Sequence, residues 1–251
     1  MPRPSGSNAV EKTLAVLDAL GDHERISDIA QATGLHKSTV HRILQDFARL
    51  GFVRVTEQGT YQGGARILGL AGRVLARTGA AQRAEPELAA LQADCGGAVH
   101  LALVDGDEAV YVAKVEGDKP YRMASRVGMS LPLHCTSIGK AVLAALPEPD
   151  VRALLARTRP VARTARTLVE PDAVVGHLVG VRERGYSVDD EENELGVRCV
   201  GAAVFDHTRR VIGAVSVSQL VSDPDGRPPE ELGPRVAAAA REISRLLGAP
   251  G

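Results

Sequence analysis

Six polar side chains that can hydrogen-bond to base edges gather within nine residues of this sequence. They are Lys37, Ser38, Thr39, His41, Arg42 and Gln45. In the major groove of DNA, Lys and Arg pair with guanine and Gln pairs with adenine. The chemistry that these residue types favour is recognition of double-stranded DNA, provided that one surface presents them together.

Two short helices joined by a tight turn would present them in that way. A helix starting behind Ser27 points Ile29, Ala30 and Leu35 inward, and Gly34 supplies the turn. A second helix then buries one apolar stripe and leaves the polar residues outside; the stripe comprises Val40, Ile43, Leu44, Phe47 and Leu50. The pattern predicts a helix-turn-helix whose second helix reads the major groove.

A short hairpin follows the second helix. Residues 52–55 and 60–62 alternate as strands do, and Glu57, Gln58 and Gly59 form a turn between them. This hairpin is the wing of a winged helix. Arg49 and Arg54 are expected to contact backbone phosphates, which positions the domain without reading sequence. The alternative, a helical hairpin with a merely solvated polar face, does not explain helix, turn and wing in this order.

Helices are also predicted on either side of this unit. An apolar stripe at Val10, Leu14, Leu17 and Leu20 indicates a helix that packs under the recognition helix. Residues 65–77 carry a wider apolar face, which is typical of a connecting helix that rests on a partner, so we expect a dimer. We assign residues 1–64 to a winged helix-turn-helix DNA-binding domain, 65–80 to a linker helix and 81–251 to a second domain.

The second domain is predicted to be α+β. Strands are expected at 98–104 and 109–115, which form a hairpin, and at 121–127, 199–205 and 211–220. Helices are expected at 86–91, 141–146, 149–156, 171–184 and 229–247. Antiparallel hairpins with segregated helices describe a sheet core.

Two segments of this domain suggest a binding site. Residues 133–143 form a loop that runs into a helix behind Thr136 and Ser137, and the unpaired N–H groups of a helix start can hold an anion. Ser216 and Ser218 lie on one face of an apolar strand, and their hydroxyls need partners. On its own segment, the helix start is better explained by ordinary capping, and the serines are equally explained by hydrogen bonds within the protein.

An acidic run and three cysteines allow other interpretations. Residues 185–199 carry five acids, which indicates a solvated loop; the run lacks the spaced ligands of a metal site, so no metal or cofactor is predicted. The cysteines are Cys95, Cys135 and Cys199; their odd number and spacing favour reduced thiols. A cysteine-dependent enzyme could use Cys199 or Cys135 as nucleophile and His134 or His100 as base. The sequence shows no third group to orient the base, so we predict no enzyme.

Charge and hydropathy limit the class of protein. Residues 1–79 carry ten Lys/Arg and seven Asp/Glu, whereas the remainder carries twenty and twenty-four, so the basic part coincides with the predicted DNA reader. No apolar run is long enough to span a membrane, and the first residues lack a signal-peptide pattern. We expect a cytoplasmic protein without a membrane partner.

Four stretches resemble the IclR family of bacterial transcriptional regulators. They are residues 37–42, the run from 131–134 into 136–141, residues 185–192 and residues 213–218. The resemblance extends from about Ala9 to Leu247. It implies an N-terminal winged helix, a linker helix and a C-terminal GAF-like effector domain, in a homodimer or a dimer of dimers that regulates operons, often as a repressor.

The resemblance also implies a site for a small carboxylate effector. The family's pocket maps onto backbone amides at Ser137 and Ile138 and onto side chains at Asp189, Cys199, Ser216 and Ser218. Effector binding would change the placement of two recognition helices on a pseudo-palindromic operator. A regulator with a vestigial pocket and no small-molecule ligand is the alternative.

Four residues at three places depart from the family pattern. Ser137-Ile138 replaces a smaller pair, which adds bulk at the pocket's edge, and His36 replaces a frequent Pro at the start of the recognition helix. Gly63 stands before Gly64 where relatives more often carry Leu, which removes an apolar anchor from the link between domains.

Overall fold

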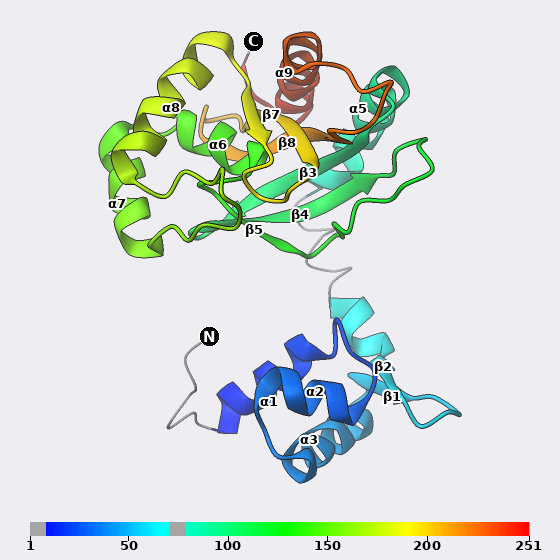
Figure 1. Cartoon of the computed structure of the whole chain (residues 1–251). Helices are drawn as coiled ribbons and strands as arrows, with labels where there is room; N and C mark the ends of the chain where they lie inside the picture. Colours follow the sequence, from blue (N-terminus) through cyan, green and yellow to red (C-terminus); the bar gives the residue numbers. More distant parts are fainter. Residues whose placement is uncertain (1–8, 71–78, 251) are drawn as a thin grey trace. The chain divides into compact units, whose positions relative to one another are not determined.

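The computed structural model describes residues 9–70 and 79–250. The chain divides into two compact units, Met1–Thr78 and Gly79–Gly251 (Figure 1). Residues 65–70, at the start of the predicted linker helix, are helical. The part of that prediction at residues 71–78 lies outside the described residues.

The first unit is a winged helix-turn-helix, as the sequence predicts. Helices α1 (Ala9–Ala19), α2 (Ile26–Thr33) and α3 (Lys37–Arg49) precede a hairpin of β1 (Val53–Val55) and β2 (Tyr61–Gly63). Gly34 ends α2 with a φ of 67°, a conformation that glycine adopts without strain. The core contains Val16, Leu20, Ile29, Val40, Ile43, Leu44, Phe47, Val53 and Tyr61.

Three details of the predicted packing are wrong. In α1 the buried residue is Val16, and Leu20 just after the helix is buried too, whereas Val10 and Leu14 are 65% and 54% exposed. Helix α1 therefore rests on α2 and α3 through its C-terminal half only. Leu50 is exposed because α3 ends at Arg49, and α2 begins at Ile26 without a side-chain cap, so Ser27 is not its cap.

The loop between α1 and α2 holds the wing. Glu24 accepts hydrogen bonds from the Tyr61 backbone through its carbonyl (2.8 Å) and from the Gln62 side chain through its carboxylate (2.7 Å). A Cβ on Gly64 would lie 2.5 Å from the Gly51 carbonyl oxygen, so only glycine fits there. Gly63, by contrast, has room for a side chain, since its nearest neighbour would be Ile67 at 3.9 Å.

The second unit is built on a six-stranded antiparallel sheet of order β5-β4-β3-β8-β7-β6. Its strands are β3 (Ala98–Asp105), β4 (Glu108–Val115), β5 (Ser130–Pro132), β6 (Ser187–Asp190), β7 (Val197–Phe205) and β8 (Val211–Leu220). Its helices are α5 (Ala80–Cys95), α6 (Ser137–Ala144), α7 (Glu148–Thr158), α8 (Pro171–Arg184) and α9 (Pro229–Leu246).

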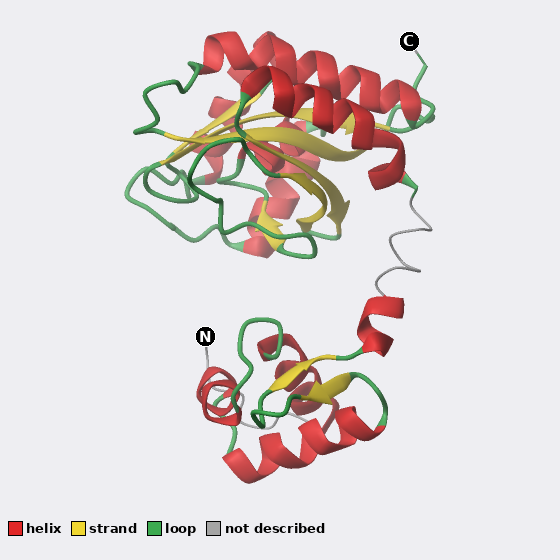
Figure 2. Ribbon diagram, turned by 90° about the vertical axis from the view of Figure 1, so that its right-hand side faces the viewer, coloured by secondary structure: helices red, strands yellow, loops and turns green. Residues whose placement is uncertain are grey.

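Helices cover both faces of the sheet (Figures 1 and 2). Helices α5 and α9 pack on one face through an apolar core that includes Val99, Leu101, Val215 and Val217. Helices α6, α7 and α8 cover the other face through a second core. Strand residues alternate between the faces, so His100, Cys199, Ser216 and Ser218 share the α6 side.

Local packing overrides three predictions in this unit. Helix α5 begins at Ala80 rather than Pro86, because buried Ala84, Leu88 and Leu91 form one stripe on both sides of the proline. Residues 121–127 form no strand; Lys114 Nζ instead binds the carbonyls of Met123 (3.0 Å) and Ser125 (2.8 Å). Part of the predicted acidic loop is strand β6, which pairs with β7.

Candidate functional site

The outer side of α3 carries the predicted DNA-reading residues. Most of them are exposed: Lys37, Ser38, His41, Arg42 and Gln45, with Thr39 half-buried. Their neighbours at Val40, Ile43 and Leu44 are buried in the core of the unit. The alternation of apolar and polar positions along α3 therefore fixes which face meets solvent.

The cations on this face differ in their partners. The side chains of Lys37 and Arg42 make no ion pair or hydrogen bond with the described residues. Arg49, in contrast, forms a 3.0 Å pair with Asp46. An unpaired cation can neutralise a phosphate or bind guanine without first giving up a partner, so Lys37 and Arg42 are the best placed of the predicted contacts.

The start of α3 offers a second means of holding a phosphate. His36 precedes the helix without a side-chain cap, and the backbone N–H groups of Lys37 and Ser38 have no acceptor among the described residues. Free N–H groups at a helix N-terminus attract anions, and Lys37 adds a formal positive charge at the same point.

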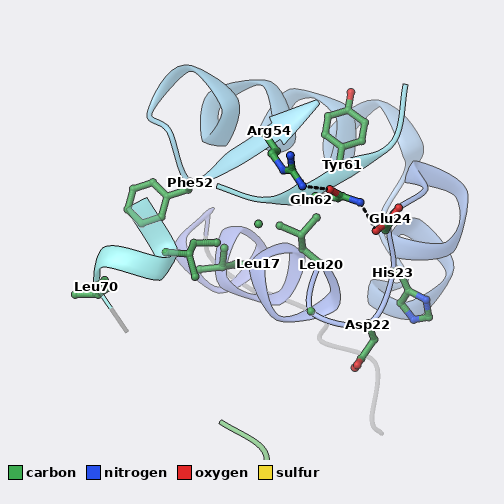
Figure 3. Close-up of a pocket in the computed structure, with 13 residues that line it drawn as sticks. Leu17, Leu20, Asp22, His23, Glu24, Phe52, Arg54, Tyr61, Gln62 and Leu70 are labelled. Atoms are coloured by element: carbon green, nitrogen blue, oxygen red, sulfur yellow. Dashed lines mark hydrogen bonds between the residues drawn. The ribbon is translucent and has the colours of Figure 1, made fainter. Parts of the chain in front are cut away.

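Arg54 is held on the wing by its neighbours. Its guanidinium donates to Gln62 at 2.5 Å, and Gln62 in turn donates to Glu24. Figure 3 shows this chain of side chains beside a hollow of about 630 Å³ that is lined by Leu17, Leu20 and Phe52 among others. Arg54 is exposed, so it remains available to a phosphate after exchanging its amide partner.

The start of α6 forms one side of the predicted effector pocket. Thr136 caps the helix by accepting from the Gly139 backbone N–H at 3.0 Å, as its position in the sequence predicts. The N–H groups of Ser137 and Ile138 have no acceptor among the described residues. The helix is therefore capped and also retains two free donors, so the two interpretations of this segment are compatible.

Gly201 on β7 lets this helix start lie directly on the sheet. A Cβ there would be 2.9 Å from the carbonyl carbon and oxygen of Ser137 and 3.2 Å from the nitrogen of Ile138. The hydroxyl of Ser187 on β6 lies 2.5 Å from the Ser137 carbonyl oxygen and anchors it. The sheet and α6 thus position the free amides together.

Strand register brings the remaining pocket residues to the same place. Asp189 pairs with Cys199 across β6 and β7, and Cys199 pairs with Ser218 on β8. The Cys199 thiol donates to the Ser218 hydroxyl at 3.1 Å, so Ser218 has a partner within the protein. Ser216 is buried, and its hydroxyl makes no hydrogen bond with the described residues. Ser216 is therefore the serine that a ligand would satisfy.

Asp189 is a buried carboxyl in this group. Its Oδ1 accepts from the backbone N–H groups of Glu192 (2.8 Å) and Asn193 (3.2 Å). Burial raises the pKa of Asp189 to about 7, although these two hydrogen bonds act in the opposite direction. Near neutral pH this group can therefore either donate or accept a proton.

The acidic run is not the solvated loop that the sequence predicts. Lys140, which is fully buried, donates to the Val188 carbonyl and to the Glu192 carboxylate. Asp190 binds Arg166 and Arg198, and Arg166 also pairs with Glu191. No cluster of potential metal ligands occurs in residues 9–70 and 79–250. Three of the five acids, Asp190, Glu191 and Glu192, are paired with cations that hold the segment around Asp189 in place.

Three further residues lie together on the α6 side of the sheet: the sequence suggested His100 only as the base of an enzyme, and it did not single out Tyr111 or Ser125. His100 lies beside Ser216 on β3, stacks on Tyr111 at 4.7 Å and contacts the Ser125 hydroxyl at 2.7 Å. The one signal for His100 is a histidine at an inward position of an otherwise apolar strand. Tyr111 and Ser125 had none, because only the folded sheet brings them to His100.

The two thiols near the site are poor nucleophiles. Burial and then Asp189 raise the pKa of Cys135 to about 12, and the same two causes raise the pKa of Cys199 far above its usual range. His134 contacts the carbonyl of Val161 (3.1 Å) instead of a cysteine. These features argue against a cysteine-dependent enzyme.

Among the helices that the structure describes, none is long and apolar enough to cross a membrane.

Sequence comparison connects both units to one family. Residues 9–57 match the IclR helix-turn-helix domain, and residues 72–245 match the bacterial transcriptional regulator IclR C-terminal domain. The HTH-type transcriptional regulator XynR of Escherichia coli strain K12 is 36% identical over 96% of this chain and 98% of its own length. The transcriptional repressor IclR of the same strain is 36% identical over 89% of this chain and 82% of its own.

Solved structures agree with this assignment. IclR of Thermotoga maritima has a TM-score of 0.77 at 32% identity and covers 96% of this chain and 99% of its own. An IclR homolog from Microbacterium hydrocarbonoxydans, complexed with 4-hydroxybenzoate, shares the fold with a TM-score of 0.78 at 22% identity, over 96% of this chain and 99% of its own. The winged helix, the sheet domain and these matches together show that the chain belongs to the IclR family of bacterial transcriptional regulators.

Proposed function

We propose that this protein binds a specific operator in double-stranded DNA, and that a small organic acid bound in the second unit changes this binding. The DNA-binding part is supported by the exposed polar face of α3, where Lys37 and Arg42 are free to contact DNA. Its relatives in the family are named transcriptional regulators and repressors.

One observation carries the effector part of the proposal. Unsatisfied donors converge on the α6 side of the sheet: the N–H groups of Ser137 and Ile138 and the hydroxyl of Ser216. A carboxylate accepts hydrogen bonds from several donors at once, and the positive end of the α6 dipole favours its charge. Asp189, Cys199 and Ser218 complete the pocket. The 4-hydroxybenzoate complex of the Microbacterium protein supports the idea that this fold can hold an organic acid.

A homodimer, or a dimer of dimers, is the assembly we propose. Its support is apolar surface in the first unit: Val10 and Leu14 of α1 are 65% and 54% exposed, and Leu68 and Leu70 are 72% and 50% exposed. A second copy could bury these side chains and would supply the second reader that a pseudo-palindromic operator requires. Light scattering of the Leu14→Glu variant should then show a smaller particle than the wild type.

The experiment that tests DNA recognition is selection of bound fragments from the genome of the source organism, followed by sequencing. The wild type should enrich a few sites with two related half-sites, and Arg42→Ala should lose that enrichment while keeping its fold by circular dichroism. Arg157→Ala provides a matched control, since Arg157 is an exposed arginine in the second unit. Equal enrichment by wild type and Arg42→Ala would remove α3 from the reading surface.

A further inference from the structure

His100 lies in a row of directly paired residues that crosses four strands of the sheet. Ser216 pairs with Gly201 of β7 on one side and with His100 of β3 on the other, and His100 pairs with Lys114 of β4. Directly paired residues point to the same face, so His100 lies on the α6 side with Ser216. From Gly201 to His100 the row spans two strand spacings, about 10 Å.

The His100 ring is fixed in place but incompletely bonded. It is 1% exposed, its Nε2 contacts the Ser125 hydroxyl at 2.7 Å, and it lies against the Tyr111 ring with an angle of 35° between the ring planes. Its Nδ1 has no hydrogen-bond partner among the described residues, and neither does the neighbouring Ser216 hydroxyl. A buried polar group without a partner is costly, so the unpaired Nδ1 of His100, on the residue paired with Ser216, indicates a place that a ligand fills.

The charges of His100 and Lys114 determine which chemical group of a ligand can bind beside Ser216. Burial and then the neighbouring Lys114 lower the pKa of His100 to about 4, so the ring is neutral at physiological pH. Lys114 is already occupied by two carbonyls and by Glu116 at 3.0 Å. A neutral imidazole next to a serine suits a hydroxyl, which donates and accepts, and offers no counter-charge to a second carboxylate.

We infer that His100 and Ser216 form a hydroxyl-binding subsite, and that the effector is a small hydroxy acid whose carboxylate lies at the amides of Ser137 and Ile138. This inference rests on the proposed function and specifies the ligand class of the same pocket. The hydrogen bond between His100 Nε2 and the Ser125 hydroxyl decides the role of Nδ1. If Ser125 donates to Nε2, Nδ1 carries the proton and donates to the ligand hydroxyl; if Nε2 donates to Ser125, Nδ1 accepts from it.

The test compares acids that differ only by hydroxyl groups. Calorimetry on the full chain would measure lactate against propionate, malate against succinate and gluconate against hexanoate. In at least one pair the hydroxy acid should bind about tenfold more tightly. The variant His100→Phe keeps a ring on Tyr111 but loses both nitrogens, so this preference should disappear. His177→Phe is the matched control, because His177 on α8 also has an unpaired Nε2, and it should keep the preference.

A wild-type measurement covers the case in which His100→Phe does not fold. The hydroxy acid of the selective pair should shift the imidazole nitrogen resonances of one histidine, and its deoxy partner should leave them unchanged. Equal affinities within every pair, or a preference that survives His100→Phe, would overturn the subsite while leaving the effector proposal standing. Failure of all six acids to bind would overturn both.

Discussion

Gly201 offers a direct test of how the pocket is positioned. In Gly201→Ala the new Cβ would lie 2.9 Å from the Ser137 carbonyl, whereas ordinary contacts begin at 3.4 Å. The first turn of α6 must therefore move by about 0.5 Å, against the Ser187 hydroxyl that holds it at 2.5 Å. Overpacking of this kind costs about 1–3 kcal/mol of folding free energy.

The same shift should weaken effector binding, because it moves the two free amides away from Ser216. Each kcal/mol lowers the melting temperature of a domain of this size by about 2–4 °C, so we expect the melting temperature of the second unit to fall by about 2–12 °C. Effector affinity should fall by about tenfold or more, since misplacing one hydrogen bond to a charged group costs about 1.5–3 kcal/mol. Circular dichroism melts and calorimetry would measure the two effects.

Gly176→Ala is the matched control. Gly176 lies on the exposed side of α8 with no atom within 4 Å of a new Cβ, so alanine should stabilise the helix by about 0.5–1 kcal/mol and leave affinity unchanged. If Gly201→Ala melted and bound ligand like Gly176→Ala, the close seating of α6 on β7 would be wrong.

Three further perturbations address the surroundings of the pocket. The folded pKa of Asp189, near 7, exceeds its ordinary 3.8, so the stability it contributes is complete below pH 3.8 and is lost as pH rises through 7. In Asp189→Asn, the melting temperature should no longer fall over this pH range. Carboxylate binding, which should weaken above pH 7 in the wild type, should not weaken in this variant. If the melting temperature of the variant still fell with pH, another group would be responsible for the titration. Lys140→Met leaves Glu192 buried and unpaired, and it should lower the free energy of unfolding in denaturant by about 3–5 kcal/mol. Adding Glu192→Leu should recover much of this loss. If the losses of the two single variants simply added, Lys140 and Glu192 would not form a direct pair. Iodoacetamide near neutral pH should label Cys199 slowly, because its thiol is protonated; labelling as fast as that of an activated thiolate would revive the enzyme hypothesis.

The sequence was most informative where local patterns decide structure. The stripe from Val40 to Phe47 and the glycine turn at Gly34 suffice to predict α3 and its outer face, because helical periodicity and turn chemistry are local. The strands at 199–205 and 211–220 were predicted nearly to the residue for the same reason.

Predictions failed where distant residues decide. Nothing near residues 121–127 indicates that Lys114 takes their carbonyls, and nothing near Glu192 indicates a buried lysine on α6. Likewise, the proximity of His100 to Ser216 depends on the register of β3 and β8. Such contacts between segments far apart in sequence are set by tertiary packing, which single-residue patterns do not encode.

Coupling between effector binding and operator binding is best measured by fluorescence anisotropy of a selected operator fragment with the full chain, titrated with the organic acid that binds most tightly. We predict that saturating acid shifts the operator dissociation constant at least fivefold, the lower end of usual allosteric coupling. In the double variant Ser216→Ala, Ser218→Ala the operator should bind as before and the shift should vanish. An unchanged dissociation constant with bound acid, or a full shift in the double variant, would show that acid bound at Ser216 and Ser218 does not control operator binding.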